Sequence, residues 1–398
     1  MENIVALLVV ALTYYIGEFV GVKTKAWIPS VFVTAVLFLV GYWTFFPQDI
    51  VVMAGLGPPL GGLLVILLCI AHMGTTLSIK QLIDQWKVVA ISLAGIAGMV
   101  ALAWIIARPI VGKEYVIAGL PSLAGGIVAA TIMNEAAMEA GLTTAAILAI
   151  AMYSIQGFVG YPLTSIMLKM EGKKLLEDYS KMEKKDASMD INEDSGLVQE
   201  KETRRSLKFV PSPPGKYVTP AFIIFKLMVT AYISNRLGAI TGLNQAVWAL
   251  ILGIVLTEIG FLDKDSLNKA KSYGFLMFIL MVYIFSGLKD ATPEILGEAI
   301  VPLIVIIITG VTGLAIMSIL VGKILKVNWN MAFAVSLTAL YGFPPNAVIT
   351  EEVCTALAKT PEEKDYLMGK MLPMMLVGGF TTVTITSVVL AGVFAGML

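Results

Sequence analysis

The chain has 398 residues, with 28 basic and 28 acidic side chains, so its formal net charge is zero. Hydrophobic residues make up 58% of it, charged residues only 14%, and its mean hydropathy is +0.85. A soluble core of this length cannot enclose so many apolar residues, so the composition excludes an ordinary soluble domain and predicts an all-α polytopic membrane protein. No basic excess indicates a nucleic-acid partner, and the only two cysteines, Cys69 and Cys354, do not indicate a disulfide framework or a metal cluster.

Segments of about 20 apolar residues, the length that crosses a bilayer as a helix, occur along the whole chain. In the first half they are predicted at 5–21, 27–46, 61–77, 88–110 and 144–168. The first of these follows Glu2 rather than a positively charged region, so we expect it to be retained and not cleaved as a signal peptide. A Lys- and Glu-rich segment at 169–217 is predicted to be a solvated linker, with a short helix at its start. In the second half, spans are predicted at 220–235, 246–259, 272–288, 300–320 and 366–393.

One stretch departs from this apolar pattern, and it occurs twice. Residues 125–143 read GGIVAATIMNEAAMEAGLT, and residues 342–360, lying 217 positions further on, read GFPPNAVITEEVCTALAKT. Aligned without gaps, they share five identities where about one is expected by chance: Gly125/Gly342, Ala130/Ala347, Ile132/Ile349, Glu135/Glu352 and Thr143/Thr360. Shorter echoes occur in the same order in other spans, including two pairs of small residues suited to close helix contact, Gly95 with Gly98 and Gly310 with Gly313. The pattern predicts two repeats, 1–168 and 218–398, joined by the linker.

The number of membrane crossings in each half decides how the repeats are oriented. If the segments 115–141 and 331–357 each dip into the membrane and return, each half has five spans and the second half is inverted. Basic residues in short loops mark the cytoplasmic side. With five spans and external termini, most loop lysines fall inside together with the linker, and the exceptions are Arg108, Lys113, Arg236 and Lys289. We therefore predict re-entrant hairpins and ten spans; the alternative is that each segment is an ordinary span with buried carboxylates.

Breaks inside such hairpins would place helix ends at mid-membrane depth. Gly125-Gly126 and the run Phe343-Pro344-Pro345 are the predicted breaks. A half-helix that begins after a break presents unpaired N–H groups and the positive end of its dipole to a ligand. Opposed hairpins of this kind hold substrate and coupling ion in secondary transporters with inverted repeats.

Polar residues in both hairpins are the candidate ligands. A carboxylate in the membrane is a functional-site hypothesis, which singles out Glu135 and Glu352; the alternative is that they lie at the wet end of the returning arm as solvated or capping groups. Neutral oxygens of the kind that sodium prefers add to the set. The predicted substrate or ion contacts are Gly125, Gly126, Asn134, Glu135, Pro345, Asn346, Thr350, Glu351, Glu352 and Thr382, with Na⁺ placed at Glu135, Asn346, Glu352 and Thr386. His72, the only histidine, is either a proton relay or a packed, hydrogen-bonded side chain.

Several short motifs carry a family resemblance. Pro345-Asn346-Ala347-Val348, Pro373-Met374, Gly378-Gly379-Phe380 and the sequence around Gly74 resemble segments of the bacterial sodium/glutamate symporter family and of related sodium-dependent carboxylate transporters. The resemblance implies two inverted five-span halves, sodium coupling, elevator-type movement of a hairpin-bearing domain on a dimeric scaffold, and a cell-membrane location with a cytoplasmic linker. The first hairpin departs from the family, because residues 125–130 read GGIVAA where the family has a glycine-rich GGHGTG-type run.

These features lead to one functional expectation and its rivals. We expect an ion-coupled secondary transporter of a small amino acid or carboxylate, working as a homodimer in the bilayer with Na⁺ or H⁺ and needing no other cofactor. The alternatives are an ion channel that uses the hairpins as a filter and a proton-coupled exporter. The sequence contains no HExxH or GxSxG motif, so we do not expect an enzyme. No arginine occurs in either hairpin, which favours a zwitterion over a multiply charged anion.

Overall fold

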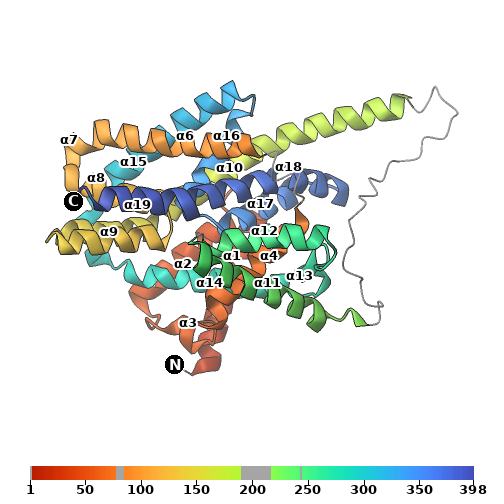
Figure 1. Ribbon diagram of the computed structural model, residues 1–398, viewed down its shortest axis with the longest axis horizontal. Coiled ribbons are helices and arrows are strands. Elements are labelled where there is room, and N and C mark those ends of the chain that lie inside the picture. The colour runs from red at the N-terminus through yellow and green to blue at the C-terminus, as the bar shows by residue number, and fades with distance from the viewer. Residues whose placement is uncertain (1, 78–84, 190–216, 243) are drawn as a thin grey trace.

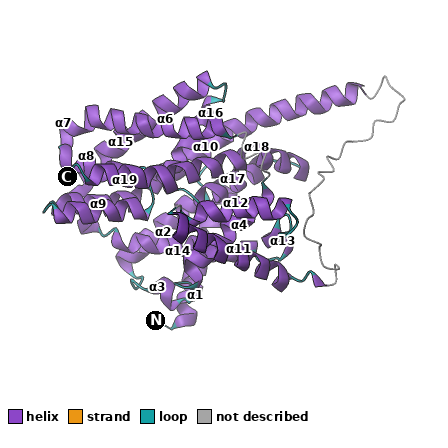
Figure 2. Cartoon of the chain, viewed as in Figure 1, coloured by secondary structure: helices purple, strands orange, loops and turns teal. Residues whose placement is uncertain are grey.

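The computed structural model describes residues 2–77, 85–189, 217–242 and 244–398, and the regular structure within them is helical (Figure 2). The elements of the first half are α1 (Asn3–Lys23), α2 (Ser30–Thr44), α3 (Ile50–Met53), η1 (Leu60–Leu64), α4 (Val65–Thr76), α6 (Trp86–Leu102), η2 (Ala103–Ala107), α7 (Arg108–Val111), α8 (Lys113–Leu123), α9 (Ile127–Glu139) and α10 (Thr143–Met189). Those of the second half are α11 (Pro220–Thr241), α12 (Gln245–Glu258), α13 (Ser266–Lys269), α14 (Tyr273–Phe285), η4 (Ser286–Asp290), α15 (Pro293–Ile324), α16 (Trp329–Leu337), η5 (Thr338–Leu340), α17 (Pro345–Leu357), α18 (Pro361–Gly379), η6 (Phe380–Thr386) and α19 (Ser387–Ala395).

Each of the ten predicted spans coincides with a helix or a continuous run of helical elements. Seven helical runs among the described residues are long and apolar enough to cross a membrane: Asn3–Lys23, Trp86–Val111, Thr143–Lys181, Pro220–Thr241, Tyr273–Asp290, Pro293–Ile324 and Pro361–Ala395. The other three, α2, η1–α4 and α12, are shorter apolar helices. At 1.5 Å per residue the 14 residues of α12 extend only about 21 Å, less than the roughly 30 Å of a hydrocarbon core. The described residues therefore form a helical membrane protein.

The helices pack most closely where glycines face each other. Figure 1 shows α6, α10, α15 and α18–α19 running along the long axis, with α1–α4 and α11–α14 gathered on one side of them. On α6, a Cβ added at Gly98 would lie 2.3 Å from the carbonyl oxygen of Gly313 on α15, and the reverse distance is 2.2 Å. Gly74 on α4 and Gly253 on α12 meet in the same way, because a Cβ added at either would lie 2.8 or 3.0 Å from the Cα atom of the other. The close approach expected of small residues in the fourth spans is thus confirmed, and it lies between α6 and α15.

Helix α10 continues past the predicted end of its span at residue 168. It extends to Met189, and the first residues of the predicted linker are not solvated: Lys169 is 3% exposed and Glu171 8% exposed. The ammonium of Lys169 donates to the carbonyl of Lys25, and the Asn328 amide donates to the Glu171 carboxylate. These charges stay buried because loops between other helices supply their partners, which a charge pattern does not reveal. The rest of the predicted linker, 190–216, lies outside the described residues.

Both segments predicted as hairpins are helix–break–helix units that double back. Tyr115 near the start of α8 and Leu142 just after α9 pack on one cluster of alanines that includes Ala145 of α10. At the second unit, Asn328 before α16 binds Glu171, and Leu357, the last residue of α17, reaches Gly172. The bases of the two units thus lie near residues 145 and 172 of α10, which at 1.5 Å per residue are about 40 Å apart. They approach α10 from opposite ends.

The glycine crossing of α6 and α15 can be tested by adding a single methyl group. Gly98→Ala places its Cβ within 2.3 Å of a backbone oxygen, whereas Gly392→Ala on α19 meets nothing within 4 Å. Overpacking at Gly98 is expected to lower the free energy of unfolding by about 1–3 kcal/mol, while Gly392→Ala is expected to be neutral or slightly stabilising. Thermal unfolding of the detergent-solubilised chain, followed by tryptophan fluorescence, measures both. Equal stability of the two variants would contradict the close crossing.

Candidate functional site

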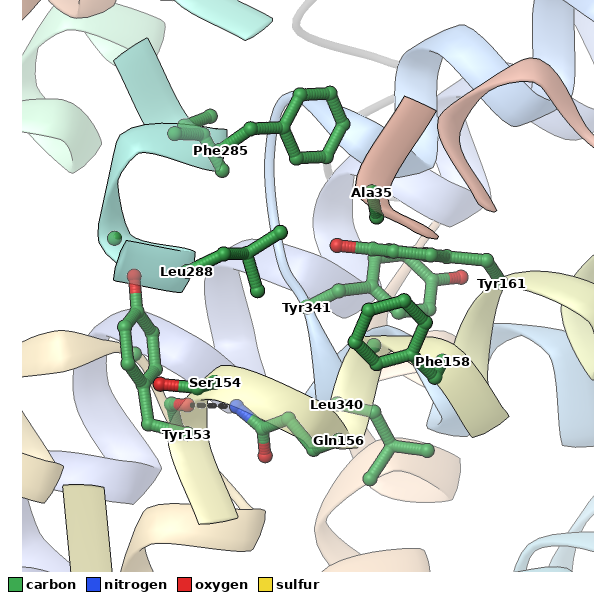
Figure 3. A pocket seen from close by; sticks show the side chains of 15 residues that line it. Ala35, Tyr153, Ser154, Gln156, Phe158, Tyr161, Phe285, Leu288, Leu340 and Tyr341 are labelled. Atoms are coloured by element: carbon green, nitrogen blue, oxygen red, sulfur yellow. Dashed lines mark hydrogen bonds between the residues drawn. The ribbon is translucent and has the colours of Figure 1, made fainter. Parts of the chain in front are cut away.

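The breaks of the two doubled-back units meet at one cavity. It has a volume of about 60 Å³ and is lined by Gly125 and Gly126 from the first break and by Leu340 and Tyr341 from the second. Helix α10 supplies Tyr153, Ser154, Gln156, Gly157, Phe158 and Tyr161, and the remaining walls are Ala35, Ile284, Phe285, Gly287 and Leu288 (Figure 3). Two chain segments from corresponding positions of the two halves therefore line one cavity, together with the middle of α10.

Each break is held in place by neighbouring helices. The side-chain amide of Gln156 donates to the carbonyl oxygen of Gly125 at 2.9 Å, so the first break does not leave that carbonyl unpaired (Figure 3). A Cβ at Gly125 would lie 2.3 Å from that of Ser387, which explains why glycine is required there. Gly342 adopts a φ of +66°, a conformation that favours glycine, and turns the chain into α17. Both breaks thus depend on close backbone approach.

A single side chain of the last span separates the two breaks. Cβ atoms added at Gly126 and Gly342 would lie 3.2 and 3.0 Å from the γ-methyl groups of Val383. Val383 belongs to η6, a π-helical turn between α18 and α19. Such turns interrupt the regular hydrogen-bond ladder and frequently mark functional positions. The last span therefore contacts both breaks at the point where its own helix is irregular.

Three of the predicted site residues are buried polar side chains near the second break, two on α17 and one on η6 of the last span. Asn346, Thr350 and Thr382 are all 0% exposed. The Asn346 amide donates to the carbonyl of Met375, the Thr350 hydroxyl to that of Asn346, and the Thr382 hydroxyl to that of Gly378. Of the polar atoms of these three side chains, Oδ1 of Asn346 is the buried one that has no hydrogen-bond partner among the described residues. Pro345 opens α17 as its first residue, a position where its missing N–H is not needed.

The predicted acidic pair is not brought together. Glu352 accepts hydrogen bonds from the backbone N–H and the hydroxyl of Ser30, each at 3.0 Å, and so caps the N-terminus of α2. Glu351 pairs with Lys364 at 3.6 Å in a partly exposed position. Both line a second, wider cleft of about 580 Å³ that also contains Glu18. Glu135 is exposed on α9 and does not line the cavity between the breaks.

The remaining predicted residues have structural partners. Asn134 donates to the carbonyl of Ala146, tying α9 to α10, and Thr386 donates to the carbonyl of Thr381 across the π-helical turn. His72 accepts a hydrogen bond at Nδ1 from the N–H of Leu267, and its Nε2 lies 3.8 Å from the carboxylate of Asp265. Among the described residues, no group of three or more His, Cys, Asp or Glu side chains is arranged to hold a metal ion. The four residues proposed for Na⁺ do not line the cavity between the breaks.

Sequence reasoning missed the polar side chains that line the cavity from α10 and from the second break. Gln156 and Tyr161 of α10 and Tyr341 at the break were not singled out, although Gln156 is the one amide side chain in its apolar span. It is 2% exposed, and its Oε1 atom has no hydrogen-bond partner among the described residues. The Tyr341 hydroxyl lies 2.6 Å from that of Thr164. The available signal was a glutamine in an apolar span. Its contact with the glycine pair could not be read from the sequence, because Gln156 and Gly125 are 31 positions apart.

Comparison with known proteins does not assign the chain to a family. No family model matches the chain, and no curated protein matches it with significant similarity. The function is therefore argued from the geometry of the cavity and of the units that form it.

The capping role of Glu352 is open to a direct test. Glu352→Ala removes the acceptor for Ser30 and is expected to lower the free energy of unfolding by about 1–2 kcal/mol. The neighbouring Glu351→Ala removes only a partly exposed ion pair, and its effect is expected to stay within about 0.5 kcal/mol. Thermal unfolding of the two variants in the same detergent measures the difference. A Glu352→Ala variant as stable as Glu351→Ala would show that the cap contributes nothing.

Proposed function

We propose that the chain is an ion-coupled secondary transporter of a small amino acid or carboxylate, working by alternating access. The observation that carries the proposal is the cavity at which the two breaks meet. Irregular backbone at membrane depth is tolerated where it is buried in protein or lines a cavity. A transporter of this type places its substrate between such broken helices.

The order of elements supports two inverted repeats. In each half, four spans precede a broken unit, and a long last span follows it: α8–α9 and then α10 in the first half, and α16–α17 and then α18–α19 in the second. The two units approach α10 from opposite ends, as opposed re-entrant hairpins would. We therefore propose ten spans with both termini external and the linker cytoplasmic in a cell membrane. A homodimer with elevator-type movement belongs to the same proposal.

Ion coupling follows from the neutral oxygens near the breaks. Asn346 Oδ1 is a buried carbonyl-type oxygen without a partner in the described part of the chain, and the hydroxyls of Thr350 and Thr382 lie buried near the same break. Oxygen ligands of this kind suit Na⁺, whereas a proton-coupled carrier needs a titratable group at its site. We therefore propose Na⁺ rather than H⁺ as the coupling ion.

Uptake into proteoliposomes tests this function. With a panel of amino acids and small carboxylates outside, an inward Na⁺ gradient is expected to drive saturable accumulation, while a proton gradient of equal size is expected to give uptake near the passive leak. Accumulation driven only by the proton gradient would show that the coupling ion is H⁺ and not Na⁺. Flux indifferent to both gradients would overturn ion coupling, and single-channel currents would indicate a pore instead.

Cysteine labelling tests the re-entrant topology. Glu114 and Ala140 are exposed at the two ends of the first unit, and Trp329 and Lys359 are exposed at the ends of the second. The native cysteines, Cys69 and Cys354, are buried and give little background. An impermeant maleimide is expected to label Glu114→Cys and Ala140→Cys in intact cells, and Trp329→Cys and Lys359→Cys only after permeabilisation. Labelling of Glu114→Cys and Ala140→Cys from opposite faces would make the first unit an ordinary span.

A further inference from the structure

The walls of the cavity between the breaks are uncharged. Among the described residues that line it, the polar ones are Tyr153, Ser154, Gln156, Tyr161 and Tyr341, and the rest are apolar or glycine. A dicarboxylate bound here would carry two negative charges away from water with no cationic side chain beside them. Transferring an unpaired charge from water into such surroundings is very costly. The cavity is therefore unsuited to a multiply charged anion.

One buried acceptor in this cavity has no partner in the described part of the chain. It is Oε1 of Gln156, whose side chain is 2% exposed and whose nitrogen already donates to Gly125. A buried acceptor without a donor is destabilising, so this atom would gain from a ligand that brings N–H donors. The hydroxyl of Tyr161, whose side chain is 8% exposed, also lines the cavity and points toward Phe285 and Leu288 (Figure 3).

The start of α9 offers the N–H donors that a carboxylate group needs. This helix has 13 residues, and Gly126, which precedes its first residue, lines the cavity. The amides of Ala129 and Ala130 donate to the carbonyl of Gly126, so the amides of Ile127 and Val128 are the ones at the open end. The first amides of a helix and the positive end of its dipole favour a carboxylate. One end of the cavity thus suits an anion, and Gln156 suits a cation.

The aromatic walls of the cavity also favour a bound cation. The rings of Tyr161 and Tyr341 lie 5.3 Å apart between centroids, next to Phe158 (Figure 3). Ring faces attract an ammonium group without adding a formal charge. The volume of about 60 Å³ is roughly five times the 10–15 Å³ that one water needs, which corresponds to a ligand of about five or six non-hydrogen atoms. Glycine and alanine have this size.

We propose that the cavity binds a small zwitterionic amino acid with a short, uncharged side chain. The ammonium is held by Gln156 Oε1, the Tyr161 hydroxyl and the tyrosine rings, and the carboxylate lies at the start of α9. The inference rests on the proposed transport function and specifies its substrate. Glutamate is excluded by its second carboxylate and its additional length.

Binding measured apart from transport tests the proposal. The purified full-length chain is titrated with glycine, alanine, glutamate and succinate by calorimetry, in sodium chloride and in choline chloride. Glycine or alanine is expected to bind at least tenfold more tightly than glutamate or succinate. Tighter binding of glutamate or succinate would overturn the inference.

Tyrosine variants test the named contact. Tyr161→Phe removes only a hydroxyl, so the fold is retained and the Kd for alanine is expected to rise about 3- to 10-fold. The matched control is Tyr42→Phe: Tyr42 is also 8% exposed with an unpartnered hydroxyl, but it does not line the cavity, so its Kd is expected to equal that of the wild type. Equal Kd values for Tyr161→Phe and Tyr42→Phe would overturn the assignment of Tyr161.

The outcomes separate the inference from the transport function. Gradient-driven uptake of succinate or glutamate, without uptake or binding of glycine or alanine, would overturn the inference about the substrate but would support the proposed transport function. Binding of alanine with the expected loss in Tyr161→Phe, but without gradient-driven uptake, would support the site and overturn the transport function.

Discussion

A helix that stops inside an apolar medium leaves peptide groups without partners, and the arrangement of this chain follows from that constraint. The groups freed at the first break are reached by Gln156 of α10, whose amide donates to the Gly125 carbonyl. At the second break, the Asn346 amide donates to the last span at Met375. In both cases a long helix that follows the broken unit supplies or receives the hydrogen bond. The broken helices are stable only because α10 and α18–α19 run beside them.

The same principle explains where the charges lie. Buried charged groups such as Lys169 and Glu171 are hydrogen-bonded by loops at one end of α10, and Glu352 is satisfied by the start of α2. The cavity in the middle of the helix is lined by uncharged residues. Charged side chains bound to neutral hydrogen-bonding groups therefore link helix ends, while the interior between the breaks contains only neutral groups. This separation keeps the desolvation of full charges away from the cavity.

Most of the fold could be predicted from the sequence, because helix formation in an apolar chain depends on local composition. The ten apolar segments and the breaks at Gly125-Gly126 and Phe343-Pro344-Pro345 were predicted from hydropathy and from glycine or proline content. The segments are helical, and the chain is broken at Gly125-Gly126 and just before Pro345, which begins α17. The solvation predicted for the start of the linker was wrong at Lys169 and Glu171, because the partners of these two side chains come from distant loops.

The site was less predictable, because it depends on contacts between segments far apart in sequence. Glu135 and Glu352 are equivalent in the alignment, yet only Glu352 meets Ser30, 322 positions away, and Glu135 faces outward. An internal repeat preserves backbone position but not the neighbours that surround it. Gly125 and Gly126 were identified because a break has a local signature, whereas Gln156 and Tyr161 have none.

The position of Val383 has a mechanical consequence. Its Cγ1 methyl group would lie 3.2 Å from a Cβ added at either Gly126 or Gly342, and its Cγ2 methyl group would lie 3.0 Å from the one at Gly342. Because the same side chain is packed against both breaks, a displacement of η6 relative to one break changes its contact with the other. The irregular turn of the last span is therefore the element through which the two breaks are in mechanical contact.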